Sequence, residues 1–165
     1  MNSLDKLQEL IKDIEFAFLT TVESDGTLRG RPMATQKSDR SGYLWFFTKI
    51  HSAKIDEINR ESHVHLSYSQ PGENRYVSVS GRAQVVRDQA RIDELWSPAL
   101  KAWFPEGKAD PEIALLRVTI DQAEYWDAPS STMVKIAGFV KALATGQEYH
   151  PGENEKLDFD KESAA

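Results

Sequence analysis

Two groups of cationic and hydroxyl side chains lie in the first third of the sequence, at spacings that suit an anion. In the first group, Arg29, Arg31 and Met33 alternate along a predicted strand, so their side chains share one face, with Pro32 beside them. A guanidinium on a barrel strand is costly to bury unless it meets an anion, although a solvated outer face is the commoner arrangement. The strand by itself favours the solvated face and leaves the anion site open.

The second group lies where the next predicted strand gives way to a helix. Thr48 ends the strand, Ser52 stands at the predicted helix N-cap, and Ala53 and Lys54 follow, with Lys49 nearby. Free backbone N–H groups at a helix N-terminus, together with a hydroxyl and lysines, favour a phosphate. An ordinary capped helix with surface lysines is the alternative. Convergence of both groups on one ligand would favour the phosphate.

Aromatic residues could supply the walls of a cleft for a planar heterocycle. The set comprises Trp45, Phe46, Phe47, Trp96, Trp103, Phe104, Tyr125 and Trp126. The helical spacing of Trp96, Trp103 and Phe104 favours packing in the core. Trp126 stands at the end of a predicted strand, immediately before Asp127, and this position favours the rim of a site.

Other chemistries find less support. The chain has no cysteine, which excludes disulfides, thiol nucleophiles and thiolate metal sites. His63 and His65 share a strand face, but spacing suggests no third ligand, so we predict no metal site. Ser78 and Ser80 have no His–Asp partner nearby in sequence, and the glycine-rich loops of P-loop and Rossmann sites are absent. We therefore assign no catalytic residue.

Hydrophobic periodicity and turn residues predict the elements that position these groups. We expect strands at 15–22, 27–36, 43–48, 63–69, 76–86, 113–120 and 123–127, the first two joined by a hairpin at Asp25 and Gly26. Helices are expected at 3–13 with Ser3 as N-cap, at 53–60, after Asp88 and at 131–144. This pattern predicts a mainly β (α+β) fold: a six- to seven-stranded antiparallel barrel with short flanking helices.

Length and charge define the domain organisation. The 165 residues suit one domain, which we place at 1–146, followed by an acidic tail at 147–165 that we expect to be mobile or loosely docked. The tail carries −4 of the net charge of −6, so the body is close to neutral. This balance excludes general nucleic-acid binding and permits a single phosphate.

The sequence also bears on localisation. It opens without a basic segment followed by an apolar run, and no stretch approaches the ~18 apolar residues of a membrane span. We expect a cytoplasmic protein that does not contact membranes.

The order of several short segments resembles a known family. These are Phe-Leu-Thr-Thr-Val (18–22), Gly-Arg-Pro-Met (30–33), Leu-Trp-Phe-Phe-Thr (44–48), Ser-Ala-Lys-Ile-Asp-Glu-Ile (52–58), Tyr-Val-Ser-Val-Ser-Gly-Arg-Ala (76–83), the segment 95–107 and Ala-Glu-Tyr-Trp-Asp (123–127). Over about residues 4–146, the chain resembles the pyridoxamine-phosphate-oxidase-like, flavin-binding split-barrel superfamily, and within it the general stress protein 26 group.

The resemblance implies a split barrel that forms a homodimer with flavin, FMN or alternatively FAD, at the subunit interface. Arg31 and the turn at 52–54 would hold the phosphate, with Pro32 and Met33 beside it. Residues 45–48 would lie along the ribityl chain and the ring edge, and Trp126 of the second subunit would cover one side of the ring.

Two departures from the family pattern are visible. Ala53 stands where the superfamily usually has an arginine, and no arginine follows Arg117, which argues against oxidation of vitamin B6. A flavin-dependent oxidoreductase of unknown substrate is the leading hypothesis. The alternatives are a non-enzymatic flavin-binding stress or sensor protein, and a barrel that binds haem or a deazaflavin, where haem would need His63 or His65 as a ligand.

Overall fold

The computed structural model describes residues 2–36, 41–128, 132–150 and 152–159. Its strands are β1 (Phe16–Val22), β2 (Leu28–Ala34), β3 (Tyr43–Lys49), β4 (His63–Gln70), β5 (Arg75–Val86), β6 (Ile113–Asp127) and β7 (Glu153–Asp158). Its helices are α1 (Ser3–Ile11), α2 (Ala53–Arg60), α3 (Gln89–Leu95) and α4 (Thr132–Thr145), with single 3-10 turns η1 (Pro71–Glu73) and η2 (Pro98–Ala102). The bounds of β1 to β5 and of α1, α2 and α4 lie within two residues of those expected from the sequence.

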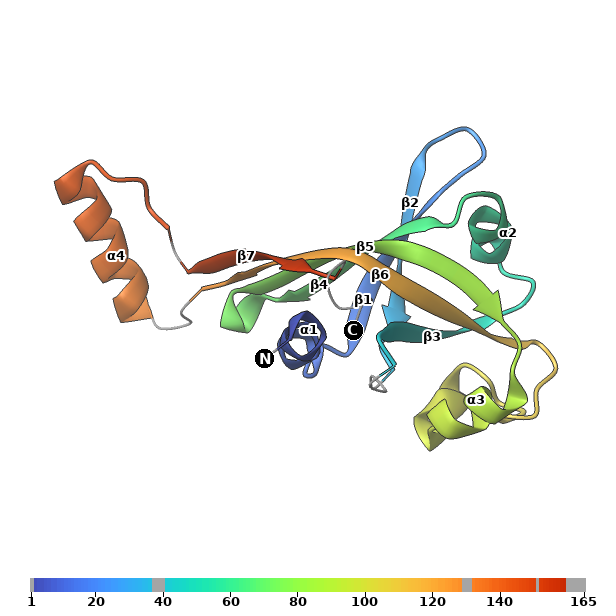
Figure 1. Cartoon of the computed structure of the whole chain (residues 1–165). Coiled ribbons are helices and arrows are strands. Elements are labelled where there is room, and N and C mark those ends of the chain that lie inside the picture. Colours follow the sequence, from blue (N-terminus) through green and yellow to red (C-terminus); the bar gives the residue numbers. More distant parts are fainter. Residues whose placement is uncertain (1, 37–40, 129–131, 151, 160–165) are drawn as a thin grey trace.

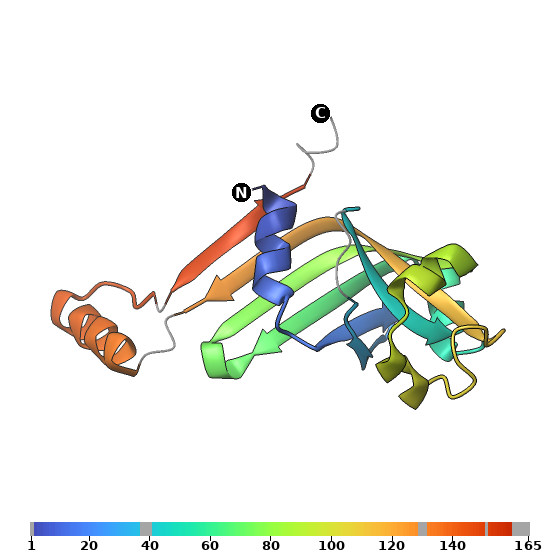
Figure 2. The ribbon, with the colours of Figure 1, turned by 90° about the horizontal axis from the view of Figure 1, so that it is seen from below.

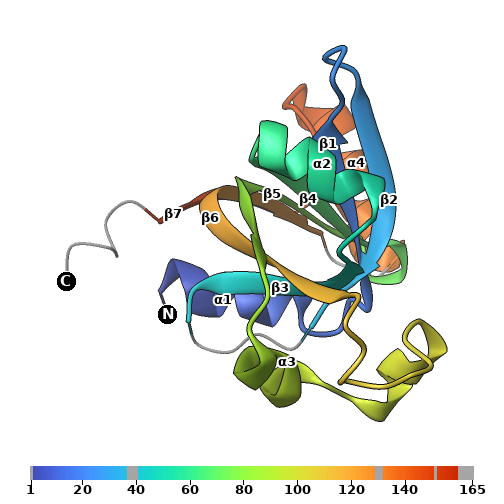
Figure 3. The same cartoon turned by 90° about the vertical axis from the view of Figure 1, so that its right-hand side faces the viewer.

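The strands form one antiparallel sheet that curls into a half-barrel (Figure 3). Their order is β2-β1-β4-β5-β6-β3, and β7 pairs with β6 outside this path. The two ends of the path approach each other, because the Gln36 backbone N–H donates to the Trp45 carbonyl at 3.4 Å. The predicted α+β fold, a six- to seven-stranded antiparallel split barrel with short helices, is confirmed.

β6 is one continuous strand where the sequence suggested two segments. Its first half pairs with β3 and its second half with β7, while β5 pairs along its length with a register shift at Ser80 and Gly81. A side chain at Gly81 would collide with the Thr119 carbonyl. The glycine therefore permits the close approach at which β6 changes neighbours.

Local turn chemistry explains the β1–β2 hairpin. Gly26 has a φ of +84°, and its N–H donates to the Glu23 carbonyl at 3.0 Å. The predicted hairpin is confirmed. The predicted N-cap of α1 is wrong by one residue: the Asn2 side chain accepts from Asp5 N–H, whereas the Ser3 hydroxyl donates to the Asp158 carbonyl and joins α1 to β7.

Alternation along β3 separates two apolar cores. Leu44 and Phe46 face the main core inside the curl, which α1 and α2 also enter, whereas Trp45 and Phe47 face a second cluster outside it. Ile92 of α3 and Leu100 of η2 complete this second cluster. Figure 2 shows α1 crossing the sheet, and Figure 3 shows α3 lying outside the curl below β3.

The segment after residue 146 contains a strand that the sequence did not predict. β7 pairs with β6 from Gln122 to Asp127, and Leu157 is buried against the main core. The Asn154 amide donates to the Tyr125 carbonyl at 3.0 Å. From its acidity we expect a mobile or loosely docked tail at 147–165. Within it, the six residues of β7 extend the sheet at the edge that β6 leaves open.

α4 lies away from the sheet (Figure 1), between β6 and β7 in the chain. Its large side chains at Ile136, Phe139, Val140 and Leu143 are each more than half exposed. Within the described ranges, no helix is long and apolar enough to cross a membrane.

Candidate functional site

A cleft of about 590 Å³ lies where β2, β3, the start of α2 and η2 meet. It is lined by Phe16, Pro32, Met33, Ala34, Gln36, Phe47, Thr48, Lys49, Ser52, Lys54, Leu100, Ala102, Trp103 and Phe104. Six of the residues predicted from sequence therefore meet in one cavity: Pro32, Met33, Phe47, Thr48, Ser52 and Lys54. β2 and the N-terminus of α2, which the sequence treated as separate candidates, contribute to the same site.

The polar end of the cleft is a chain of hydrogen-bonding groups at the start of α2. Lys54 Nζ donates to Thr48 Oγ1 at 3.0 Å, and Thr48 Oγ1 lies 3.2 Å from Ser52 Oγ. Among the described groups, Ser52 Oγ accepts no capping bond from the helix backbone. Its hydroxyl points towards Thr48, so the first N–H groups of α2 have no side-chain cap.

Lys54 is positioned to hold a negative charge. Burial lowers the pKa of its ammonium group below the ordinary 10.5, and the nearby Arg31 and Arg29 lower it further, while Glu57 opposes them. An anion that enters the cleft would relieve this unfavourable environment, because it would restore an opposite charge beside the ammonium.

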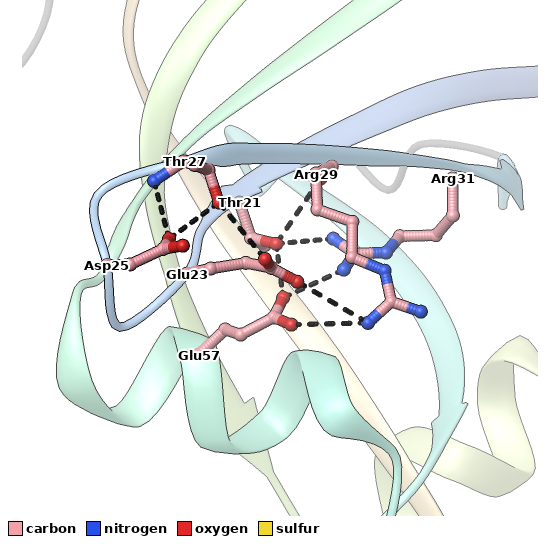
Figure 4. A network of polar contacts seen from close by, with 7 residues as sticks. All are labelled: Thr21, Glu23, Asp25, Thr27, Arg29, Arg31 and Glu57. Atoms are coloured by element: carbon pink, nitrogen blue, oxygen red, sulfur yellow. Dashed lines mark hydrogen bonds and ion pairs between the residues drawn. The ribbon is translucent and has the colours of Figure 1, made fainter.

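Arg31 is held beside this end of the cleft by a buried network (Figure 4). Its guanidinium donates to Glu57 Oε2 at 2.8 Å and to Thr21 Oγ1 at 2.5 Å, and the Thr21 hydroxyl donates to the same Glu57 oxygen. Arg29 reaches the other oxygen of Glu57 at 3.7 Å. Arg31 itself is not among the residues that line the cleft, but it is close enough for its charge to lower the pKa of Lys54 at the polar end.

Glu57 is the residue that sequence reasoning missed. It is only 5% exposed, and burial raises the pKa of its carboxyl, but hydrogen bonds from Thr21 and Arg31 and the charges of both arginines outweigh burial and lower it overall. The carboxylate is therefore charged in the interior and fixes Arg31. The available signal was an acid between Ile55 and Ile58, on the buried face of α2.

The apolar end of the cleft is built on the second cluster. Phe47 packs edge-on against Trp96, with ring centroids 6.0 Å apart, and against Phe104 at 6.1 Å. The prediction of core packing is confirmed for Trp96 and Phe104. It is wrong for Trp103, which lines the cleft and is 51% exposed.

A family model described as pyridoxamine 5'-phosphate oxidase like matches residues 2–150. The chain belongs to this family. The match covers the whole curled sheet through β6, together with α4, and agrees with the resemblance drawn from the short sequence segments.

Individual relatives of this pyridoxamine 5'-phosphate oxidase-like protein agree with the family assignment. Protein bli-3 of Neurospora crassa is 28% identical over 154 residues, which cover 87% of this chain and 74% of that protein. The crystal structure of the general stress FMN/FAD binding protein of Xanthomonas citri is 32% identical, has a TM-score of 0.64, and covers 75% of this chain and 87% of that one.

A solved structure of lower sequence identity shows how much of the fold is shared. A Clostridium acetobutylicum protein related to general stress protein 26 is 16% identical, with a TM-score of 0.72 over 98% of this chain and 99% of that one. At this identity the likeness concerns the fold alone. The fold extends over nearly the full length of both chains.

The other residues predicted for the site lie outside the cleft. Phe46 is fully buried in the main core, and Trp45 is 5% exposed with the Arg91 guanidinium 5.0 Å from its ring centroid. Ala53 is exposed at the start of α2. Trp126 is 43% exposed on the outer sheet face, opposite Tyr76 of β5.

The two strand histidines are engaged separately. His63 Nδ1 lies 2.7 Å from a Glu61 oxygen at the surface, and His65 Nε2 lies 2.8 Å from Ser78 Oγ. Within the described part of the chain, no group of three or more His, Asp or Glu side chains is placed to hold a metal ion.

Proposed function

We propose that this family member binds a flavin in the cleft, FMN in the first instance and FAD as the alternative. The observation that carries the proposal is that the cleft has one polar and one apolar end. Lys54, Thr48 and Ser52 are linked by hydrogen bonds at the polar end, and Phe47 and Trp103 form the wall of the apolar end. FMN has the matching chemistry, because a phosphate stands at one end and a planar ring at the other. Donors and a cation suit the first, and aromatic side chains suit the second.

The relatives support this assignment. The Xanthomonas citri protein is named as an FMN/FAD binding protein, and this chain covers 87% of its length at 32% identity. With Ala53 in place of the arginine, the cations available to a phosphate are Lys49 and Lys54 in the lining of the cleft and Arg31 beside it. This donor set fits a phosphate.

The proposal includes a cytoplasmic homodimer in which the flavin lies at the subunit interface. Phe18, Tyr76 and Trp126 expose 50%, 43% and 43% of their surface on the outer sheet face. A second cavity on that face shares Phe16 and Pro32 with the ligand cleft. A second copy seated there would cover these aromatic rings and bring its own Trp126 towards the ligand.

Bound flavin would supply the electron-transfer chemistry, and the described side chains would bind and orient it. We propose an oxidoreductase of undefined substrate, distinct from a vitamin B6 oxidase because no arginine follows Arg117. A non-enzymatic flavin binder is the second candidate. The lining of the cleft favours this candidate. Among the described lining residues, only Lys49 and Lys54 have titratable side chains, so the lining offers no carboxylate or imidazole as a general acid or base.

Flavin titration of the purified protein tests the proposal. Wild type should bind FMN and riboflavin with a shifted visible spectrum. Lys54→Ala should weaken FMN binding about tenfold or more, since a charge-assisted bond is lost, and leave riboflavin, which lacks the phosphate, within about twofold. Lys141→Ala, an exposed lysine on α4, is the matched control.

Each result has a defined meaning. If wild type binds neither FMN, FAD nor riboflavin, the proposal is wrong. If Lys54→Ala and Lys141→Ala bind FMN equally, the phosphate is not held at the start of α2. Turnover of the FMN complex with NADH or NADPH separates the oxidoreductase from the non-enzymatic binder, and sedimentation of wild type against Trp126→Ala tests the homodimer.

A further inference from the structure

In the segment at 98–104, Trp103 lies outside the core, whereas Leu100 and Phe104 are buried in it. Leu100 and Phe104 are 5% and 4% exposed in the second apolar cluster. The N–H groups of Trp103 and Phe104 both donate to the Leu100 carbonyl, at 3.0 and 2.9 Å. The backbone of Trp103 is therefore held between the buried residues Leu100 and Phe104, yet Trp103 itself is 51% exposed.

This exposed ring faces the ligand cleft. Phe16 of β1, 44% exposed, is the other large aromatic of the lining with a comparable exposure. An indole that stays in contact with water does not gain the free energy of burial. Exposed apolar surface in a concave site is typical of ligand binding. Since the backbone on both sides of Trp103 is anchored, its ring lies beside the cleft before any ligand arrives.

We propose that Trp103 packs against the isoalloxazine ring and is the residue of this chain that recognises the planar part of the ligand. The inference rests on the proposed flavin site and gives one of its lining residues a defined role. Trp126 lies outside the cleft in the same chain and could reach the ring only from a second copy. Ring recognition by Trp103 requires no second copy.

The two ends of the cleft then make separable contributions. Loss of a phosphate contact weakens FMN and spares riboflavin, because riboflavin has no phosphate. Loss of a ring contact weakens FMN and riboflavin by the same factor, because they share the ring. The ratio of the two affinities thus identifies which end a side chain serves.

The test measures FMN and riboflavin affinities of Trp103→Ala, Trp103→Phe and Phe139→Ala. Aromatic stacking on a planar base contributes enough for about a tenfold loss, so Trp103→Ala should weaken both flavins about tenfold. Trp103→Phe keeps an aromatic face and should recover most of the affinity. Phe139→Ala removes a ring of similar exposure, 52%, from α4 and should bind both flavins as wild type does.

Flavin emission supplies a second measurement that does not depend on activity. An indole in contact with the ring quenches flavin fluorescence, so saturated Trp103→Ala and Trp103→Phe complexes should be brighter than the wild-type complex. Thermal unfolding of each variant confirms that it is folded before titration.

The outcomes distinguish this inference from the function on which it rests. Wild-type binding with no change in either affinity or emission for Trp103→Ala overturns the role of Trp103 and leaves the flavin site standing. A loss confined to FMN also overturns it, because that pattern belongs to the phosphate end. Absence of any wild-type flavin binding overturns both proposals.

Discussion

The two ends of the cleft are built in different ways. At the polar end, Arg31 is fixed by Glu57 and Thr21, which are 5% and 0% exposed, in a closed network between β1, β2 and α2. At the apolar end, Trp103 is half exposed on a turn anchored by the buried Leu100 and Phe104. The site therefore combines residues that also hold the fold together, such as Arg31 and Glu57, with a residue that the fold leaves half exposed, Trp103.

This difference has a consequence for mutagenesis. A residue of the buried network cannot be changed without loss of stability, so a binding defect there is ambiguous. Lys54 and Trp103 face the cleft, so their substitution should report on binding directly. The predictions below test this division between residues that support the site and residues that contact the ligand.

The largest expected effect is on stability, from removal of the buried carboxylate. Glu57→Ala leaves the Arg31 guanidinium, whose side chain is 17% exposed, without its ion-pair partner. Breaking a buried pair in this way should lower the free energy of unfolding by about 3–5 kcal/mol. Urea denaturation measures it. The control is Glu61→Ala at the C-cap of the same helix, where the carboxylate is 44% exposed, and this variant should stay within about 0.5 kcal/mol of wild type. Equal losses in the two variants would contradict the network's structural role.

The pH dependence of stability tests the same network with Glu57→Gln, a variant that keeps the size of the side chain and removes its charge. The pKa of Glu57 lies below the ordinary 4.5. Burial raises this pKa, but the hydrogen bonds from Thr21 and Arg31 and the charges of both arginines outweigh burial. A carboxylate with a lowered folded-state pKa contributes stability above its unfolded pKa and loses it as pH falls through the folded value. Wild type should therefore lose stability below about pH 4.5 more steeply than Glu57→Gln in urea melts at several pH values. Parallel curves would show that Glu57 is not charged in the fold.

Secondary structure could be predicted from local patterns, because turn residues and alternation act over a few positions. The Asp25-Gly26 hairpin and the buried face of β5, with Val77 and Val79, follow from such signals. β7 could not be predicted this way. Its acidic composition opposes burial, and it is ordered by pairing with the distant β6.

The site was predictable where side chains share a local element and unpredictable where partners come from afar. Thr48, Ser52 and Lys54 are close in sequence, so their convergence follows from one strand–helix turn. Glu57 meets Thr21 across 36 positions, and no local pattern specifies that contact. The prediction of core packing is wrong for Trp103, because helical spacing cannot distinguish a buried ring from one on the wall of a cleft.

A smaller effect, on binding, is expected from alkaline pH. Burial and then Arg31 lower the pKa of Lys54, so in the free protein it loses its proton below the ordinary 10.5. Only the ammonium form attracts a phosphate, so FMN affinity should fall as pH rises through that lowered pKa, while Lys54→Ala shows no such fall there. Riboflavin, measured beside FMN over the same range, corrects for titration of the flavin ring, which both ligands share. A fall of the same size for both flavins would place the titrating group away from the phosphate end.

The smallest expected effect is on the stability of Trp103→Ala. It separates a residue that contacts the ligand from a residue that supports the site. Trp103→Ala should change the free energy of unfolding by no more than about 0.5 kcal/mol, because half of the ring is already in water and the neighbouring anchors are retained. Phe104→Ala, one position along and 4% exposed, should cost about 3–5 kcal/mol through the cavity it leaves. Denaturation of both variants without ligand measures the contrast. A Trp103→Ala loss as large as that of Phe104→Ala would mean that Trp103 is as structural as its buried neighbour, and the division between residues that support the site and residues that contact the ligand would fail.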